Sequence, residues 1–439
     1  GRAYLAQEGP AYDVVLLSMP GTYRPVTSGA YSLAEDYTYT VEGFRAALAR
    51  LDAGGILVVP RWLQVPPSES LRAFALVVEA MEDAGGDPAQ RLVALRSYNQ
   101  MLILARKGPF TPEEIAQIRE FAPERGFDLV YLPGIEPQEA NQRNLLPSPD
   151  YYRAFAGLLA AEDRDTWLAG YAFDVSPPTD DHPFFGHFFR WRQAREVMAM
   201  AGHVWQPFGG AGYLVLVALL VIASLAAGLL VLLPLAAPSE TRAALGRRRT
   251  VLSLLPFGLL GLAYLFVEIP LLQRLILFLG HPTYAMATVL GALLLFSGVG
   301  SLLSGRVKLG TSVGLLIGLV VVYRFGLPLL SGPLLRLPLA ARVLVTVGAL
   351  APLGMLMGMP LPSSLSRLET SAPGLTPWAW GINGALSVMA SILAALVALT
   401  WGFNRVLWLG ALCYLGAWLT SVWATRSRRR PRAPRSPRP

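Results

Sequence analysis

The 439-residue sequence predicts an α/β domain over residues 1–205, a transmembrane helical domain over residues 206–425 and a disordered basic tail over residues 426–439. Hydrophobic residues make up 53% of the chain, more than soluble proteins usually contain, so membrane-spanning segments are expected. Charge is divided unevenly: residues 1–205 carry 18 basic and 26 acidic side chains, whereas the rest of the chain carries 19 and 3. The basic character therefore reflects membrane topology, and no nucleic-acid partner is needed to explain it.

The α/β assignment begins with Tyr12–Ser18, whose β-branched and leucine residues are typical of a strand buried on both faces. Thr38–Leu51 places apolar side chains along one face of a helix. We expect Gly54 and Gly55 to end that helix and Ile56–Pro60 to form the next strand. A strand, a helix and a strand in one sheet make a right-handed parallel unit.

The remaining elements of this domain follow in order. A capping box formed by Thr111 and Glu114, with Pro112 between them, predicts the start of a helix. The expected elements are a helix over Ser68–Ala84, an antiparallel hairpin of Leu92–Arg96 and Met101–Ala105, a helix from Pro112 to about Phe121, a strand over Asp128–Leu132 and a helix over Ser148–Leu159. A parallel sheet with an antiparallel pair at its far end is typical of the C-terminal part of a Rossmann-like, class I methyltransferase fold.

Polar side chains gather in the loop between the first strand and the first helix. Ligands of parallel sheets bind beyond the carboxyl ends of the strands, so this loop is expected to face a ligand. Its candidate site residues are Ser18, Glu35, Asp36 and Tyr39. The alternative interpretation is an ordinary polar crossover loop.

A second candidate site is the segment TDDHPFF, which begins at Thr179. Asp180 and Asp181 beside His182 are suited to bind a cation or an amine. Alternatively, the run caps a turn while its two phenylalanines pack on the domain or on the membrane surface. We expect no metal site, because the only cysteine is Cys413 and it lies within an apolar run.

Seven apolar segments approach or exceed the roughly 20 residues that cross a bilayer core. They are Gly209–Leu235, Val251–Leu277, Tyr284–Leu303, Ser312–Leu330, Ala340–Met359, Trp378–Leu399 and Val406–Ala424. Short loops join them, so an antiparallel bundle is expected. Small residues recur at a spacing that favours close helix approach, namely Gly291, Gly298, Gly300, Gly381, Gly384, Ser387 and Ala390.

Ionisable residues within these segments predict a polar site inside the bundle. Glu268, Gln273 and Arg274 lie in the second segment, where charges are costly unless paired or solvated. Alternatively, Pro270 kinks the helix and residues 268–279 lie along the membrane interface. Asn383 in the sixth segment is expected to form a hydrogen bond between helices.

Orientation follows from the arginines. Four lie in residues 242–249 and seven in the tail from Arg426, and both regions are therefore expected to be cytoplasmic, with the protein in the inner membrane of the cell and in contact with anionic lipid. Seven spans would then place the soluble half outside, unless a span around Glu268 or Arg324 is miscounted.

Several strings together suggest a known family. In the soluble half they are YDVVLLS, SLAEDYTYTVEGF, GGILVVPRW and TDDHPFF, and in the membrane half LFVEIPLLQRLILFLGHPTYA, LLLFSGVGSLLSG and PWAWGINGALSVMASILA. With these strings the chain resembles the spermidine synthase family, specifically its membrane-embedded bacterial branch. Soluble members transfer an aminopropyl group from decarboxylated S-adenosylmethionine to putrescine. The resemblance implies that fold, an S-adenosylmethionine-type donor and a small amine acceptor.

The chain departs from this family at two places. The family's acid at the end of the YDV strand, which helps to deprotonate the attacking amine, is replaced by Ser18, and serine is a poor base near neutral pH. Glu35 is the expected substitute. The family's Gly-rich loop and ribose-binding acid would lie before Gly1, so the chain is expected to be truncated at its N-terminus and impaired in holding the donor.

The leading hypothesis is a membrane-bound transferase that moves an aminopropyl or other alkyl group to an amine or a lipid-borne acceptor. Ser18, Glu35 and Tyr39 would line the acceptor site, while Asp36, Asp180, Asp181 and His182 would bind the cationic substrate. The alternative is a transporter or sensor for a small solute such as a polyamine, with Glu268 and Arg274 in its path and a degenerate transferase domain. A scaffold without chemistry is the third possibility.

Overall fold

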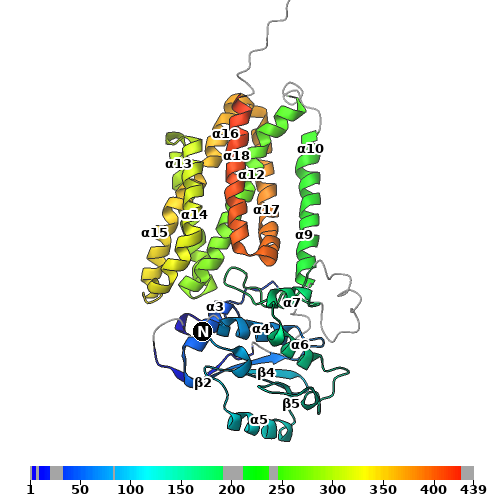
Figure 1. The fold of residues 1–439 in the computed structure, drawn as a ribbon. Coiled ribbons are helices and arrows are strands. Elements are labelled where there is room, and N and C mark those ends of the chain that lie inside the picture. The colour runs from blue at the N-terminus through cyan, green and yellow to red at the C-terminus, as the bar shows by residue number, and fades with distance from the viewer. Residues whose placement is uncertain are drawn as a thin grey trace, which may run out of the picture. The chain divides into compact units, whose positions relative to one another are not determined.

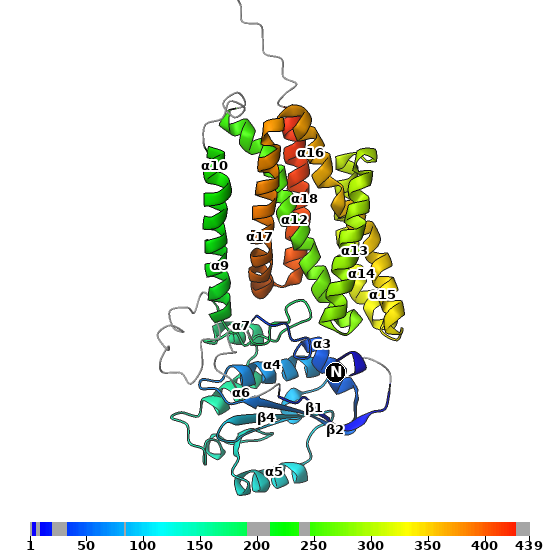
Figure 2. The ribbon, with the colours of Figure 1, turned by 180° about the vertical axis from the view of Figure 1, so that it is seen from behind.

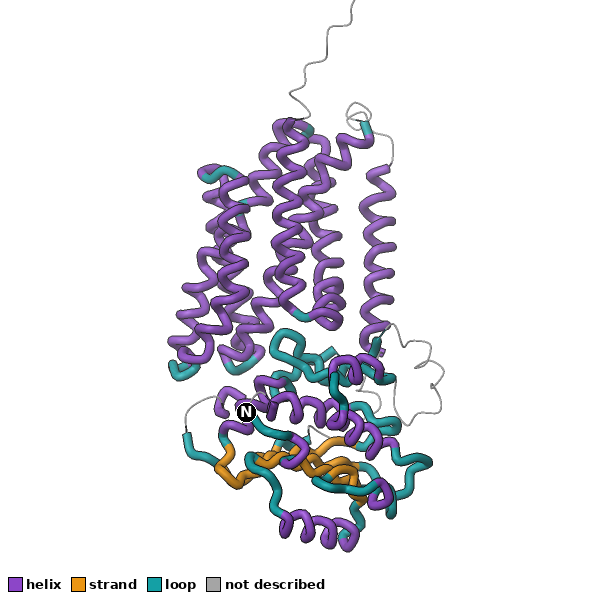
Figure 3. Tube along the Cα trace, viewed as in Figure 1, coloured by secondary structure: helices purple, strands orange, loops and turns teal. Residues whose placement is uncertain are grey.

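The computed structural model describes residues 2–5, 9–19, 33–82, 85–190, 211–236 and 246–426. The chain divides into two units, Gly1–Val215 and Leu216–Pro439. Figure 3 shows that the strands belong to the first unit and that the second is built from helices. The predicted boundary at residue 205 and the predicted disordered tail after residue 426 lie outside the described residues.

The first unit alternates strands and helices, as the sequence predicts. Its elements are α1 (Arg2–Leu5), β1 (Tyr12–Leu16), α3 (Val41–Ala49), β2 (Leu51–Trp62), α4 (Glu69–Glu82), η2 (Pro88–Gln90), β3 (Leu92–Arg96), β4 (Gln100–Arg106), α5 (Pro112–Glu124), β5 (Asp128–Tyr131), η3 (Pro137–Glu139), α6 (Asp150–Ala160) and α7 (Arg164–Gly170). The capping box at the start of α5 is confirmed, since Thr111 and Glu114 bond each other's backbone. Both edges of most predicted elements are correct to within a few residues.

The strands form one mixed sheet in the order β1-β2-β4-β3-β5. β1 and β2 are parallel, and β4 runs antiparallel to both β2 and β3. β5 pairs antiparallel with β3. The predicted parallel unit and the predicted hairpin are confirmed within a small mixed sheet, but the hairpin lies inside the sheet and its far edge is β5.

Helices cover both faces of this sheet. Figures 1 and 2 show α3, α4 and α6 on one face and α5 on the other. The larger core lies on the first face, where Phe44, Phe74 and Phe155 are fully buried. A smaller core beneath α5 contains Val93 and Leu132. Burial of these apolar side chains on both faces is what fixes the sheet between its helices.

Two predictions about the opening strand and helix are wrong. The helix ends at Ala49 rather than at the glycines, because the backbone N–H of Arg50 bonds back to the last turn. Gly54 and Gly55 lie inside β2, and a Cβ atom on Gly55 would stand 2.7 Å from the carbonyl oxygen of Tyr12. The glycine at position 55 therefore permits close approach of β1, which is a recognised use of glycine in strands.

The first strand is also less buried than its composition suggests. β1 lies at the edge of the sheet, and the side chains of Val14 and Leu16 are 58% and 59% exposed. A run of apolar residues predicts a central strand only if strands lie on both sides. In the described residues β1 has one neighbour, β2.

The second unit contains helices long and apolar enough to cross a membrane, seven of them among the described residues. These spans are Gly212–Leu235, Arg248–Leu279, Pro282–Arg306, Leu309–Leu327, Leu339–Ser371, Pro373–Trp401 and Phe403–Trp423. Each overlaps one predicted segment, so the chain is a multi-pass membrane protein. The helices are α9 (Ala211–Ala227), η5 (Gly228–Leu232), α10 (Leu233–Ala236), α12 (Arg247–Leu279), α13 (Pro282–Leu303), η6 (Ser304–Arg306), α14 (Leu309–Leu334), α15 (Leu339–Gly358), α16 (Pro360–Ser371), η7 (Pro373–Leu375), α17 (Thr376–Trp401) and α18 (Phe403–Arg426).

Helix α12 is the centre of the packing in this unit, where it contacts α13, α17 and α18. It continues through Pro256 and Pro270 to Leu279. Glu268 and Arg274 therefore lie on one continuous helix.

Glycines bring two pairs of helices into backbone contact. The sequence predicts such contacts, but only some of the predicted glycines make them. A Cβ on Gly300 of α13 would lie 1.9 Å from the carbonyl oxygen of Met355, and one on Gly358 of α15 would lie 2.0 Å from that of Ser297. Gly261 of α12 likewise approaches Asn383 of α17. By contrast, Gly291, Gly298 and Gly384 have nothing within 4 Å of such a Cβ, so they do not mediate close helix contacts.

Candidate functional site

The two stretches singled out in the soluble half lie side by side, although about 140 residues separate them. The backbone N–H of Asp36 donates to the carbonyl oxygen of Pro183 at 2.7 Å. The ring centroids of Tyr39 and Phe185 are 4.8 Å apart. The segment that follows residue 33 and the TDDHPFF segment therefore form one surface, at the start of α3.

Asp180 is the best-connected acid of this surface. Its carboxylate accepts hydrogen bonds from the guanidinium of Arg2 and, at 2.8 Å, from the hydroxyl of Thr40. Its backbone N–H donates to the side chain of Glu42 at 3.0 Å. Thr40 is also the N-cap of α3 and accepts from the N–H of Gly43. Asp180 thus links α1, the start of α3 and the TDDHPFF segment. Its negative charge is paired with Arg2, whereas the sequence predicted that it binds a cationic substrate.

Arg61, at the carboxyl end of β2, lies beneath the same surface. It is 1% exposed and pairs with Glu69 at 2.8 Å. Its guanidinium stacks 3.6 Å from the centroid of the Tyr39 ring and 4.8 Å from that of Phe185. Its Nε and Nη2 atoms are buried without a hydrogen-bond partner, as is the Tyr39 hydroxyl. Unpaired buried donors of this kind are costly and often mark a site with a function.

The two acids of the loop have perturbed protonation. Burial raises the pKa of Glu35 above its usual range. Burial also raises the pKa of Asp36, although its hydrogen bond from the N–H of Thr38 and the charge of Arg61 lower it in part. A carboxyl group whose pKa is displaced towards neutrality is suited to take up and release protons.

The other predicted site residues occupy less distinctive positions. Ser18 is exposed and lies two residues beyond the end of β1. Asp181 and His182 belong to a tight turn in which the N–H of His182 donates to the carbonyl oxygen of Thr179 at 2.9 Å. Phe184 and Phe185 are buried within the unit. The alternative interpretation of this segment, a turn followed by packed phenylalanines, is therefore what the structure shows.

Two residues of the surface escaped the sequence analysis, Arg2 and Arg61. Arg61 could have been recognised, because it is a charged residue directly after the apolar run Ile56–Pro60, and a buried charge is normally paired. Arg2 had none, because its partner Asp180 lies 178 residues away.

The predicted polar residues of the bundle do not form one cluster. Arg274 bonds Asn404 of α18, while Glu268 lies within electrostatic range of Tyr264 and Tyr414. Among the described residues no ion pair joins Glu268 to Arg274. Asn383 donates from its side chain to the carbonyl oxygen of Phe257 at 2.9 Å, which confirms the expected bond between helices. Gln273 lies next to Arg274 on α12.

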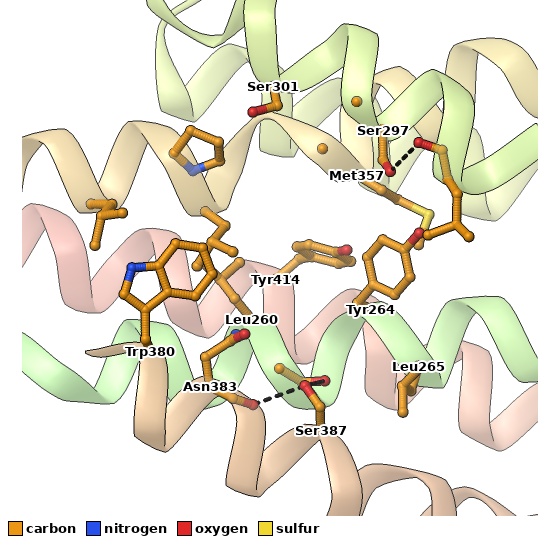
Figure 4. A pocket seen from close by; sticks show the side chains of 17 residues that line it. Leu260, Tyr264, Leu265, Ser297, Ser301, Met357, Trp380, Asn383, Ser387 and Tyr414 are labelled. Atoms are coloured by element: carbon orange, nitrogen blue, oxygen red, sulfur yellow. Dashed lines mark hydrogen bonds between the residues drawn. The ribbon is translucent and has the colours of Figure 1, made fainter. Parts of the chain in front are cut away.

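The bundle also encloses a cavity that the sequence did not predict, with a volume of about 580 Å³ (Figure 4). It lies between α12, α13, α15, α16, α17 and α18. Its polar lining residues are Tyr264, Ser297, Ser301, Asn383, Ser387 and Tyr414, and none of its lining residues carries a charge at neutral pH. A pocket of this size and character is typical of sites for small organic ligands.

In comparisons with known proteins, no family model, no curated protein and no solved structure matches the chain. Within the described parts of the chain, no group of three or more His, Cys, Asp and Glu side chains is placed to hold a metal ion.

Proposed function

We propose that the first unit is a transferase domain that alkylates a small amine, as its resemblance to spermidine synthases implies. One observation carries the proposal: Asp36 lies within electrostatic range of Arg61, at the carboxyl end of β2 in the parallel β1–β2 pair, and the pKa values of Asp36 and Glu35 are raised. This is the edge of a parallel sheet at which ligands bind. The parallel β1–β2 pair within a mixed sheet supports the same fold family.

The chemistry required of this chain is proton removal. An amine is protonated at neutral pH and attacks only after it loses that proton. Glu35 would accept the proton, while the amine nitrogen forms a bond to the transferred carbon and the carbon–sulfur bond of the donor breaks. Asp36 would bind the cationic acceptor and Tyr39 would line its site. An S-adenosylmethionine-type donor supplies the alkyl group when it is bound.

Arg61 fits this arrangement as a positioning residue. Its stacking on Tyr39 and its electrostatic attraction for Asp36 would fix both groups at the sheet edge. Its charge is offset by Glu69, so the edge remains acidic and suited to a cationic acceptor. The described residues thus fit the acceptor half of the reaction.

The test is transfer by the purified full chain in detergent, with S-adenosylmethionine or its decarboxylated form as donor and putrescine among a panel of amines. We expect an N-alkylated product by mass spectrometry, and a loss of rate of about 100-fold or more in Glu35→Gln. Glu113→Gln, an exposed acid at the start of α5, is the matched control. The activity of the unsubstituted protein should fall as the pH decreases, because Glu35 must be deprotonated to act as a base. Since the pKa of Glu35 is raised, this fall should occur at a higher pH than for an ordinary glutamate.

Absence of transfer from either donor, together with absence of donor binding by calorimetry, would refute this function. A polyamine transporter is less favoured, because the cavity in the bundle has no acidic residue in its lining. The inner membrane and a cytoplasmic tail remain part of the proposal, carried by the arginines that flank the spans.

A further inference from the structure

The cavity in the bundle holds a polar atom without a partner. Tyr414 of α18 lines the cavity, is 1% exposed, and its hydroxyl has no hydrogen-bond partner. Figure 4 shows its ring in the middle of the cavity wall, with the hydroxyl end towards Tyr264. A buried hydroxyl without a hydrogen-bond partner destabilises the protein, so its presence indicates that a hydrogen-bond acceptor binds beside it.

Three other polar groups in the wall are already engaged. Ser297 donates to the carbonyl oxygen of Leu294 at 3.1 Å, and Ser387 donates to that of Asn383 at 2.8 Å. The amide of Asn383 donates to Phe257. The hydroxyl of Tyr264, like that of Tyr414, is buried without a partner, so a ligand that these two donors can satisfy must offer a hydrogen-bond acceptor there.

The mouth of the cavity lies on the outside of the bundle. Leu294, Gly298 and Trp380 line the cavity and are also exposed on the surface of the unit. They belong to α13 and α17, which are candidate membrane spans. In a bilayer such residues face lipid, so a ligand would enter sideways from the lipid phase rather than from water.

Charge and shape define the ligand further. A cationic amine would find no carboxylate in the lining, and an anion would find no Lys or Arg. The aromatic rings of Tyr264, Trp380 and Tyr414 offer flat apolar surface. We propose that this cavity is a binding site for a neutral, lipid-soluble molecule whose head group accepts a hydrogen bond from Tyr414. This site is separate from the proposed transferase site, and a failure of the transferase proposal would not affect it.

Decylubiquinone and monodecanoylglycerol are suitable probes, since both are neutral and carry carbonyl acceptors but differ in their head groups. Native mass spectrometry of the full chain released from detergent would count bound molecules. We expect at least one probe to bind with a stoichiometry of one, and the comparison of the two distinguishes a ring-shaped head from a glyceride. Spermidine should not occupy the cavity.

Two variants separate a ligand site from a structural gap. Gly298→Leu would add a bulky side chain to the cavity wall at a position where nothing lies within 4 Å of the added Cβ, and it should abolish binding. Gly291→Leu is the matched control on the same helix: it too has open space around its Cβ, but it does not line the cavity, and it should bind normally.

Tyr414→Phe tests the hydrogen bond itself. It removes a hydroxyl that is unpaired in the free protein, so thermal stability without ligand should be unchanged or higher, whereas affinity should fall about five- to tenfold. Equal binding of the probes to the unsubstituted, Gly298→Leu and Tyr414→Phe proteins would overturn the proposal. So would binding of neither probe, or spermidine binding that Gly298→Leu abolishes.

Discussion

Arg72 organises the end of the first unit through a single side chain. Its guanidinium donates to the backbone carbonyl oxygens of Ser176, Phe184, Phe185 and His187 at 2.6–3.0 Å. It thereby holds the TDDHPFF segment against α4. Burial and the charge of Arg72 together lower the pKa of His187 to about 3, so this imidazole is neutral in the folded protein.

The neutral state of His187 predicts a pH dependence of stability. An unfolded histidine binds a proton below about pH 6.5, whereas the folded one does so only near pH 3, so stability is lost as the pH falls between these values. At pH 5 the loss amounts to about 2 kcal/mol. His187→Phe should retain more of its stability at pH 5 than the unsubstituted protein.

Hydrogen–deuterium exchange of α4 peptides in the full chain, corrected for the intrinsic effect of pH on exchange, measures this difference. A His187→Phe protein with the original pH dependence would show that another group is responsible.

Elements could be predicted from the sequence where their signals are local. The hairpin of β3 and β4 and the capping box of α5 depend on residues within a few positions of one another, and both were found. The end of α3 was not, because Gly55 serves a contact with Tyr12 on another strand. The partners Arg2 and Asp180 likewise meet only through the tertiary fold. Local chemistry is readable in a chain, whereas the identity of distant partners is not.

The contact of α13 with α15 gives a prediction at the scale of elements. Gly300→Ala adds a methyl group where a carbonyl oxygen lies 1.9 Å away, so the helices must separate, at a cost of about 1–3 kcal/mol. Gly291→Ala, on the same helix, meets open space and should be neutral or slightly stabilising, since alanine favours helix.

Thermal unfolding of both proteins in the same detergent, followed by the recovery of monodisperse material after heating, measures the effect. Equal midpoints for Gly300→Ala and Gly291→Ala would mean that the two helices are not in backbone contact.

At the scale of the whole molecule, the number of spans determines which segments share a side of the membrane. Seven candidate spans lie among the described residues, an odd number, so if all of them cross, the chain preceding them and the tail following them face opposite sides. Arginine-rich segments favour a cytoplasmic tail. Residues of the first unit should then be reachable from outside the inner membrane, which conflicts with a cytosolic donor.

A labelling experiment decides this point. With Cys413 replaced by serine, Tyr98→Cys places a single thiol at an exposed hairpin tip. Because the proposed donor is cytosolic, we expect the thiol to be protected from a membrane-impermeant maleimide in intact cells and to react after lysis, while a fluorescent protein fused to the tail is fluorescent in the cytoplasm. Protection would mean that the first unit shares the side of the tail and that one of the seven helices does not cross, whereas labelling in intact cells would contradict the use of a cytosolic donor.

The backbone contact at Gly300 and Gly358 has a consequence for selectivity. Gly358 is itself part of the cavity wall, and Ser297, Gly298 and Ser301 flank Gly300 along α13. Two main chains already at touching distance cannot move closer, and they part only if the whole helix pair moves. The spacing of α13 and α15 at the cavity is therefore set by peptide groups rather than by adjustable side chains. The cavity should accordingly bind narrow ligands and exclude bulky ones.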